Sequence, residues 1–343
     1  MTFISAHRRA TSLWLLATIV LVVLATNVYA AVYPLTGPVF GLAIAPDSSL
    51  LVADGAAGIF EIRKGQLSQV ATLPGVSDVA PIGRGSMFAV TSRAIGGEGK
   101  VYRVSRGSMR ELADLFAFET RVNPDGGAID TNPFDIEVLN GGSALVADAA
   151  ANALLIVTEQ GDVDWIATLP DEIVPTAHAQ RLYPCPQGPP EVCNNVELPA
   201  QGVATSVAVG PDGAYYVGEL KGIPAPTGRS RIWRIAPGTR HARCGSSPAC
   251  TVVARGFTSI IDLTMGPDNK LYVVELDEQG WLAMQLGKGT GGSVNACDTR
   301  TWQCSQIASG LPMLSSAAVD GDGKVYAVTN ALIPGLISVS VVP

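Results

Sequence analysis

The feature of this sequence that most limits its possible folds is a 14-residue module that recurs six times. The module reads as an apolar strand, a tight turn and a second apolar strand that ends in a polar residue. The clearest copies span 206–219 and 262–275, which share Gly-Pro-Asp at the turn. The same frame fits residues 41–54, 78–91, 135–148 and 316–329.

Two further strands are predicted after most copies, each separated by a glycine-containing turn. Third strands are expected at 59–63, 101–105, 153–158, 231–235, 282–286 and 336–341. Fourth strands are expected at 67–73, 109–115, 163–169, 251–254 and 303–308. The turns between first and second strands use proline, aspartate and glycine, which fix φ, form Asx hydrogen bonds and supply a positive φ.

Six equal four-stranded units predict an all-β, six-bladed β-propeller with antiparallel blades. The blades are expected at about 40–75, 76–120, 132–172, 204–258, 260–312 and 314–343. The sixth copy has only three strands, so residues 31–36 are predicted to complete it: the strand 31–35 would pair with 336–341 and close the ring. A β-sandwich with a similar number of strands is the alternative, and six equal units argue against it.

The first thirty residues have the pattern of a secretory signal peptide. Arg8 and Arg9 precede an apolar run over 13–25, and Val28-Tyr29-Ala30 is a small-x-small cleavage site. The run is shorter than the ~20 residues of a spanning helix, which disfavours the alternative of an uncleaved membrane anchor. The mature chain is therefore expected to be the single domain 31–343, secreted or periplasmic, with no stable membrane insertion.

Cleavage after Ala30 would remove two arginines and no acid, so the formal charge of −7 would become −9. An acidic chain with scattered basic residues gives no indication of nucleic-acid binding.

Six cysteines form three close pairs in the sequence: Cys185 and Cys193, Cys244 and Cys250, Cys297 and Cys304. Pairing within each pair is favoured because each brackets a turn-rich loop and the pairs lie far apart, and oxidised cysteines agree with export. The spacing does not fit a zinc site. Each short loop should stabilise the fold by ~2–3 kcal/mol at most.

Acidic residues collect where first strands begin and where second strands end. In a propeller these two positions are expected at one mouth of the central channel. The set is Asp54, Asp78, Asp135, Asp148, Glu219, Asp262 and Glu275. Three interpretations stay open: caps for backbone N–H groups at each acid's own strand end, a site for Ca²⁺ or another hard cation with Asp135, Asp262, Glu219 and Glu275 as ligands, or contact with a substrate.

The longest insertions, 117–132, 171–204 and 221–229, are expected on the same face as these acids. The bridged, proline-rich segment 181–199 is the best candidate for a binding lid, with a decorated connector as the alternative. The other two cysteine pairs lie between third and fourth strands, which places them on the opposite face.

No catalytic motif is present. Only His178 and His241 would remain after signal cleavage, and they fall on opposite faces, so a Ser-His-Asp triad is not predicted. The glycine-rich segment 287–292 resembles a phosphate loop but is interpreted as a flexible turn in a hairpin loop.

Several strings in this chain resemble the ScyD/ScyE family of secreted, NHL-like six-bladed propellers. The strings lie at 132–135, 144–149, 205–213, 216–220 and 256–263, and Gly-Phe-Thr-Ser-Ile-Ile-Asp-Leu in the last is the most specific. The resemblance covers about residues 36–340. It implies the fold and export rather than a chemistry, because the family has no well-established activity.

The sequence therefore favours an exported, non-catalytic binding or scaffold propeller that presents its acidic channel mouth to a protein or small-molecule ligand. The alternative is a metal-dependent hydrolase or lactonase of the gluconolactonase/regucalcin type. A cofactor-independent condensing enzyme or lyase with Glu219 or Glu275 as general acid/base is a third hypothesis.

Overall fold

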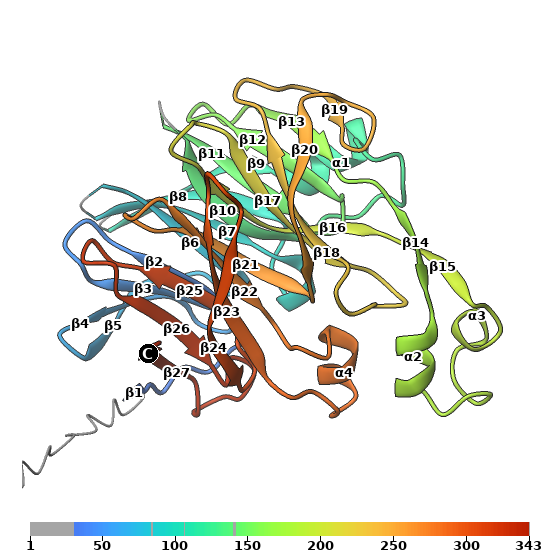
Figure 1. Ribbon diagram of the computed structural model, residues 1–343. Coiled ribbons are helices and arrows are strands. Elements are labelled where there is room, and N and C mark those ends of the chain that lie inside the picture. Colours follow the sequence, from blue (N-terminus) through green and yellow to red (C-terminus); the bar gives the residue numbers. More distant parts are fainter. Residues whose placement is uncertain (1–30, 84, 106, 140–141, 343) are drawn as a thin grey trace, which may run out of the picture.

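The computed structural model describes residues 31–342 except 84, 106, 140 and 141, so the predicted signal peptide lies outside the described residues. The chain forms a six-bladed β-propeller with four-stranded antiparallel blades, as the repeat predicted (Figure 1). The innermost strand of each blade contacts the innermost strands of the two neighbouring blades, which makes a closed ring.

The blades follow the order of the repeats. The first blade comprises β2 (Val39–Ile44), β3 (Leu50–Asp54), β4 (Gly58–Arg63) and β5 (Gln66–Thr72), and the second β6 (Val76–Gly83), β7 (Ser86–Thr91), β8 (Lys100–Ser105) and β9 (Ser108–Asp114). The third comprises β10 (Pro133–Leu139), β11 (Ser143–Asp148), β12 (Ala153–Val157) and β13 (Val163–Thr168), and the fourth β16 (Gly202–Val209), β17 (Tyr215–Lys221), β18 (Ser230–Ile235) and β20 (Cys250–Phe257). The fifth comprises β21 (Ile260–Met265), β22 (Lys270–Glu275), β23 (Gly292–Asp298) and β24 (Cys304–Leu311), and the sixth β25 (Ser316–Val319), β26 (Val325–Thr329), β27 (Ser338–Val341) and β1 (Ala31–Val32).

Closure of the ring by the N-terminal strand is confirmed. In β1, Ala31 pairs with Val339 and Val32 with Ser338. The pairing continues beyond β1, because the Tyr33 N–H donates to the Ile337 carbonyl at 2.9 Å. Tyr33 and Leu35 pack into an apolar cluster shared by the first and sixth blades, so this segment joins the two ends of the ring.

The strand predicted at 282–286 is wrong. These residues form the helix α4 (Trp281–Gln285), and the third strand of the fifth blade is β23, which begins only at Gly292. Leucine, alanine, methionine and glutamine favour a helix, whereas β23 contains few strand-forming residues and is held by pairing with strands on both sides. Residues 287–291 of the glycine-rich segment consequently lie between α4 and β23, and Gly292 begins β23.

Turns define two faces of the ring. The face here called the hairpin face carries the turns between first and second and between third and fourth strands. The opposite face, here called the loop face, carries the connections between blades. The insertions on the loop face contain α1 (Leu115–Val122), η1 (Arg93–Ile95), β14 (Glu172–Pro175), α2 (Ala177–Leu182), α3 (Pro190–Cys193) and β15 (Glu197–Ala200).

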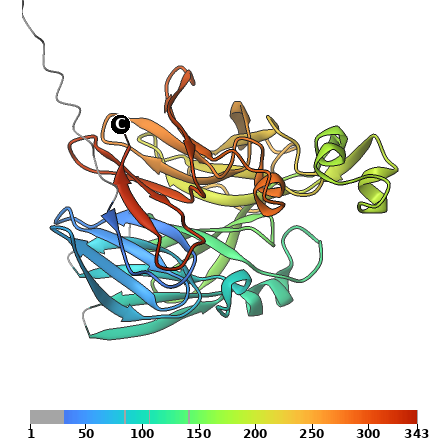
Figure 2. The ribbon, with the colours of Figure 1, turned by 90° about the horizontal axis from the view of Figure 1, so that it is seen from below.

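The segment predicted as a lid is an arm built from the hairpin β14–β15 and the helices α2 and α3. Figures 1 and 2 show these helices projecting from one side of the ring. Leu182 and Val192 pack with Leu282 and Ala283 of α4, and the His178 ring is 2.8 Å from the Gln279 carbonyl. The arm therefore leans on the fifth blade rather than over the axis.

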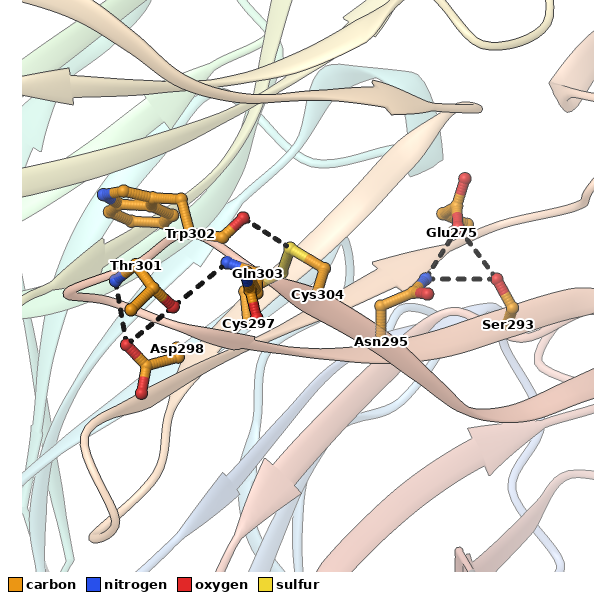
Figure 3. The surroundings of a disulfide bond; sticks show 9 residues. All are labelled: Glu275, Ser293, Asn295, Cys297, Asp298, Thr301, Trp302, Gln303 and Cys304. Carbon is orange, nitrogen blue, oxygen red and sulfur yellow. Dashed lines mark hydrogen bonds between the residues drawn. A yellow bond between two sulfur atoms is a disulfide. The ribbon is translucent and has the colours of Figure 1, made fainter.

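All three predicted disulfides are present. Cys297 and Cys304 face each other across β23 and β24 on the hairpin face (Figure 3). Cys244–Cys250 closes the loop between β18 and β20. This loop also contains the short strand β19 (Ala242–Arg243), which adds a fifth strand to the third blade.

Among the described residues, no helix has the length and apolar character needed to cross a bilayer.

Replacing Leu35 by alanine tests how much the closing segment contributes. Leu35 is fully buried, so Leu35→Ala should lower the free energy of unfolding by ~2–5 kcal/mol in urea denaturation. Val32, which is 56% exposed in the same segment, is the control, and Val32→Ala should change it by less than ~0.5 kcal/mol. Equal effects of the two substitutions would contradict the closure model.

Candidate functional site

A β-bulge recurs near the start of the innermost strand in five of the blades. In the second blade Val76 pairs with Thr91 and Asp78 with Val90, so Ser77 has no partner across the strand pair. The corresponding unpaired residues are Phe40, Phe134, Thr205 and Ile261. The bulge directly precedes the first-strand position at which Asp78, Asp135 and Asp262 occur.

These three aspartates line one cavity on the propeller axis. The cavity has a volume of about 210 Å³, and its lining also includes Glu137, which lies two residues after Asp135 on β10. Aliphatic residues such as Ala43, Val79 and Val319 make up most of the remaining wall. No lysine, arginine or histidine is among the described residues that line it, so the cavity carries four acids without a cationic partner.

Each aspartate also links its blade to the next one. The Asp78 carboxylate accepts a hydrogen bond from the Ile136 N–H at 3.0 Å, and Asp135 accepts one from the Val207 N–H at 2.6 Å. Asp262 accepts from the Ala317 N–H at 2.8 Å and from the Ser316 hydroxyl at 2.9 Å. These acids therefore cap backbone N–H groups of the next blade, whereas the capping interpretation placed the donors at each acid's own strand end.

The cavity holds the pKa values of its acids above their ordinary range. Burial raises the pKa of Asp78 to about 6, and burial followed by repulsion from Asp78 raises that of Asp135 well above its ordinary value. Burial also raises the pKa values of Asp262 and Glu137 to about 7. In mildly acidic solution these groups therefore retain protons that the unfolded chain would have released.

The acids at the ends of second strands do not line this cavity. Asp54, Asp148 and Glu275 accept hydrogen bonds from backbone N–H groups in the segments that lead into their own blades. The donors are Thr36 at 2.6 Å for Asp54, Asn132 at 2.8 Å for Asp148, and Thr258 for Glu275. Glu275 also accepts from Ser293 and Asn295 (Figure 3).

Glu219 lies in a buried ion network instead. Its carboxylate accepts hydrogen bonds from the Arg231 guanidinium at 2.6 and 2.9 Å, from the Trp233 indole at 3.0 Å, and from Lys221. Glu172 of β14 joins the network through Lys221 at 3.1 Å and Arg231 at 3.2 Å. The network therefore connects β14, at the base of the arm, to the fourth blade.

The structure thus brings together three of the seven acids singled out in the sequence and engages the other four elsewhere. The quartet Asp135, Asp262, Glu219 and Glu275 is not assembled as a metal site. Within the described ranges, no group of three or more histidine, cysteine, aspartate or glutamate side chains is placed to hold a metal ion. Glu137 also lines the cavity but was not predicted from the sequence. It lies two residues after Asp135 on the same strand, which places both side chains on the same side of the sheet.

Two phenylalanines lie between the cavity and the loop face. The bulge residues Phe40 and Phe134, which directly precede Gly41 and Asp135, meet with ring centroids 4.9 Å apart. Neither lines the cavity, whose walls run from the level of Asp78 to the strand ends at Ile44 and Val319. The cavity therefore extends toward the hairpin face, away from the insertions that were expected to share its mouth.

The two histidines are far from this cavity. His178 lies on α2 in the arm, whereas His241 stacks on Trp165 and contacts Asp164 at 2.7 Å on the hairpin face. Neither residue lines the cavity.

Comparisons with known proteins support the fold. No family model and no curated protein matches the chain. A protein of Thermus thermophilus described as a glucose dehydrogenase superposes with a TM-score of 0.57 at 18% identity, over 91% of this chain and 98% of that one. The PQQ-bound aldose sugar dehydrogenase of Streptomyces coelicolor gives 0.57 at 13%, over 92% and 96%.

A gluconolactonase of Xanthomonas campestris gives a TM-score of 0.55 at 11% identity, over 91% of this chain and 88% of that one. These likenesses show the fold. At such low identity they assign no activity.

The pKa shifts give a prediction about stability and pH. Because the folded state keeps the Asp262 proton between about pH 4 and pH 7 while the unfolded chain releases it, the stability contributed by this group falls as pH rises through that window. Asp262→Asn removes the charge and keeps an acceptor for Ala317. The variant should melt at least ~2 °C higher than the parent at pH 8, and the gain should shrink at pH 5.

Asp322, an exposed acid in the last hairpin turn, supplies the control, because Asp322→Asn should shift the melting temperature little at either pH. A melting temperature of Asp262→Asn below that of the parent at pH 8 would show that the charged form is favoured in the cavity.

Proposed function

We propose that this chain is an exported, non-catalytic binding propeller that holds a small cationic ligand in its central channel. The observation that carries the proposal is the cavity wall, where Asp78, Asp135, Glu137 and Asp262 meet without a cationic side chain among the described residues. Carboxyl groups crowded in a partly desolvated space favour a cation that replaces their shared protons.

The shape of the cavity supports a small ligand. Its volume of about 210 Å³ lies below the ~300–1,000 Å³ of sites for drug-sized molecules. Each aspartate uses one carboxylate oxygen for the neighbouring blade, and Asp78 and Asp135 also lie close enough to share a proton, which a cationic ligand could replace. Aliphatic walls beside these oxygens suit a short organic ammonium ion, which combines positive charge with methylene groups.

Export and family are part of the same proposal. The basic n-region, the apolar run and the cleavage motif of residues 1–30 support secretion to the periplasm or the medium. Three disulfides agree with an oxidising compartment. The strings shared with the ScyD/ScyE family support membership in that group of secreted propellers.

The geometry also specifies the route to the site. Since Phe40 and Phe134 lie between the acids and the loop face, the ligand enters from the hairpin face. The arm and the other insertions then remain available for a protein partner rather than for gating the channel.

Titration calorimetry with 1,4-diaminobutane at pH 7.5 tests the proposal on the chain that begins at Ala31. We expect saturable binding and a heat that varies with the ionisation enthalpy of the buffer, because the dication displaces protons. Neutral 1,4-butanediol should not bind. Glu137→Gln should weaken binding ~10- to 100-fold, the loss expected for one charged hydrogen bond.

Glu191→Gln is the matched control, because Glu191 is an exposed acid on α3, and it should leave binding unchanged. Equal binding of the diamine and the diol, or no effect of Glu137→Gln, would contradict the proposal that the channel binds a cationic ligand.

A metal-dependent lactonase is the second candidate, favoured by the fold shared with the gluconolactonase. The described channel acids do not form a ready metal site, which places this candidate behind the binding hypothesis. Release of acid from glucono-1,5-lactone, abolished both by EDTA and by Asp135→Asn, would replace the binding hypothesis with this one.

A further inference from the structure

Glu119 is a buried acid that the channel does not use. It lies on α1 in the insertion between the second and third blades, and it is 1% exposed. Its Oε1 atom is buried and has no hydrogen-bond partner in the described part of the chain. A carboxylate removed from water without a partner is strongly unfavourable, so this position calls for a proton or a cation.

A second unpartnered oxygen lies in the neighbouring turn. Asn152 is 5% exposed, and its Oδ1 atom is buried with no partner among the described residues, while its Nδ2 donates to Asp125 at 2.9 Å. The preceding residue, Ala151, belongs to the same apolar cluster as Phe118 of α1, so the turn and the helix border one core. Glu119 and Asn152 directly follow these two residues along the chain.

The charged groups near Glu119 are mostly acidic. Burial and then the nearby charges of Asp125, Asp148 and Asp130 raise its pKa to about 7. Among the ion pairs of the described residues, Arg93 approaches Asp130 at 3.7 Å, and none reaches Glu119, Asp125 or Asp148. This part of the loop face thus has an excess of carboxylate oxygens over cationic groups.

We propose that a Ca²⁺-type hard cation binds between Glu119, Asn152 and Asp125 and fixes α1 to the third blade. Carboxylate and amide oxygens are the ligands that Ca²⁺ prefers, and backbone carbonyls or water complete its six to eight contacts. Two carboxylates are fewer than the acids of a tight Ca²⁺ loop, so the affinity belongs in the ~10⁻⁴–10⁻³ M range of extracellular modules. This cation site lies outside the channel and does not depend on the function proposed for it.

Thermal unfolding of the EDTA-treated chain from Ala31, with 0–5 mM CaCl₂ or MgCl₂, tests the site. CaCl₂ should raise the melting temperature by several degrees and MgCl₂ by less, since Mg²⁺ dehydrates reluctantly and demands stricter geometry. Glu119→Gln should abolish the shift by CaCl₂. Because this variant removes an unpaired buried charge, it should fold and melt no lower than the parent in EDTA.

Asp135→Asn, in the channel, is the control that keeps the two sites apart, and it should retain the full shift by CaCl₂. Calorimetry should show about one Ca²⁺ per chain, lost in Glu119→Gln and kept in Asp135→Asn. A shift that survives Glu119→Gln, that is lost in Asp135→Asn, or that is missing from the parent would overturn the proposal. Failure of diamine binding in the channel leaves each of these outcomes unchanged.

Discussion

The structure depends on how separate blades are held in a ring. Among the described strands, none pairs across a blade boundary near the axis, so N–H groups on the inner edge of the innermost strands need other partners. Asp78, Asp135 and Asp262 supply them, because each carboxylate reaches the following blade. Hydrogen bonds to a charged acceptor contribute ~1.5–3 kcal/mol each, but the raised pKa values of these aspartates show that burial of the charged carboxylates outweighs these bonds.

This arrangement constrains neighbouring residues as well. A Cβ atom added at Gly41 would lie 2.3 Å from Asp78 Oδ1, so the first blade needs glycine at the position where the second has its acid. In the sixth blade this position is occupied by Ser316, an uncharged residue whose hydroxyl donates a hydrogen bond to Asp262. Six acids around one axis would repel too strongly, and the mixture of aspartate, serine and glycine limits that repulsion while three blade boundaries are bridged.

Local pattern and spacing were sufficient to predict the blades, the closing strand and the disulfides. They placed Asp78, Asp135 and Asp262 at one channel mouth, but together with four further acids that do not line the cavity. The third strand of the fifth blade was not predictable in this way, because β23 has a weak strand pattern and its place is set by β22 and β24 on either side. Strand position also could not show that Glu219 has Arg231 and Lys221 as partners, or that Phe40 and Phe134 meet between the acids and the loop face. These features arise from contacts between residues at different positions of the repeat or in different blades.

The number of donors around each carboxylate separates structural acids from acids that remain available to a ligand. Asp148 accepts from the N–H groups of Asn132, Ala150 and Ala151 and from the Thr131 hydroxyl, which uses most of its lone pairs. Asp135 has one backbone donor from the next blade and another acid, Asp78, beside it. Two acids with similar burial thus have different surroundings, because Asp148 is enclosed by donors whereas Asp135 lines the channel cavity.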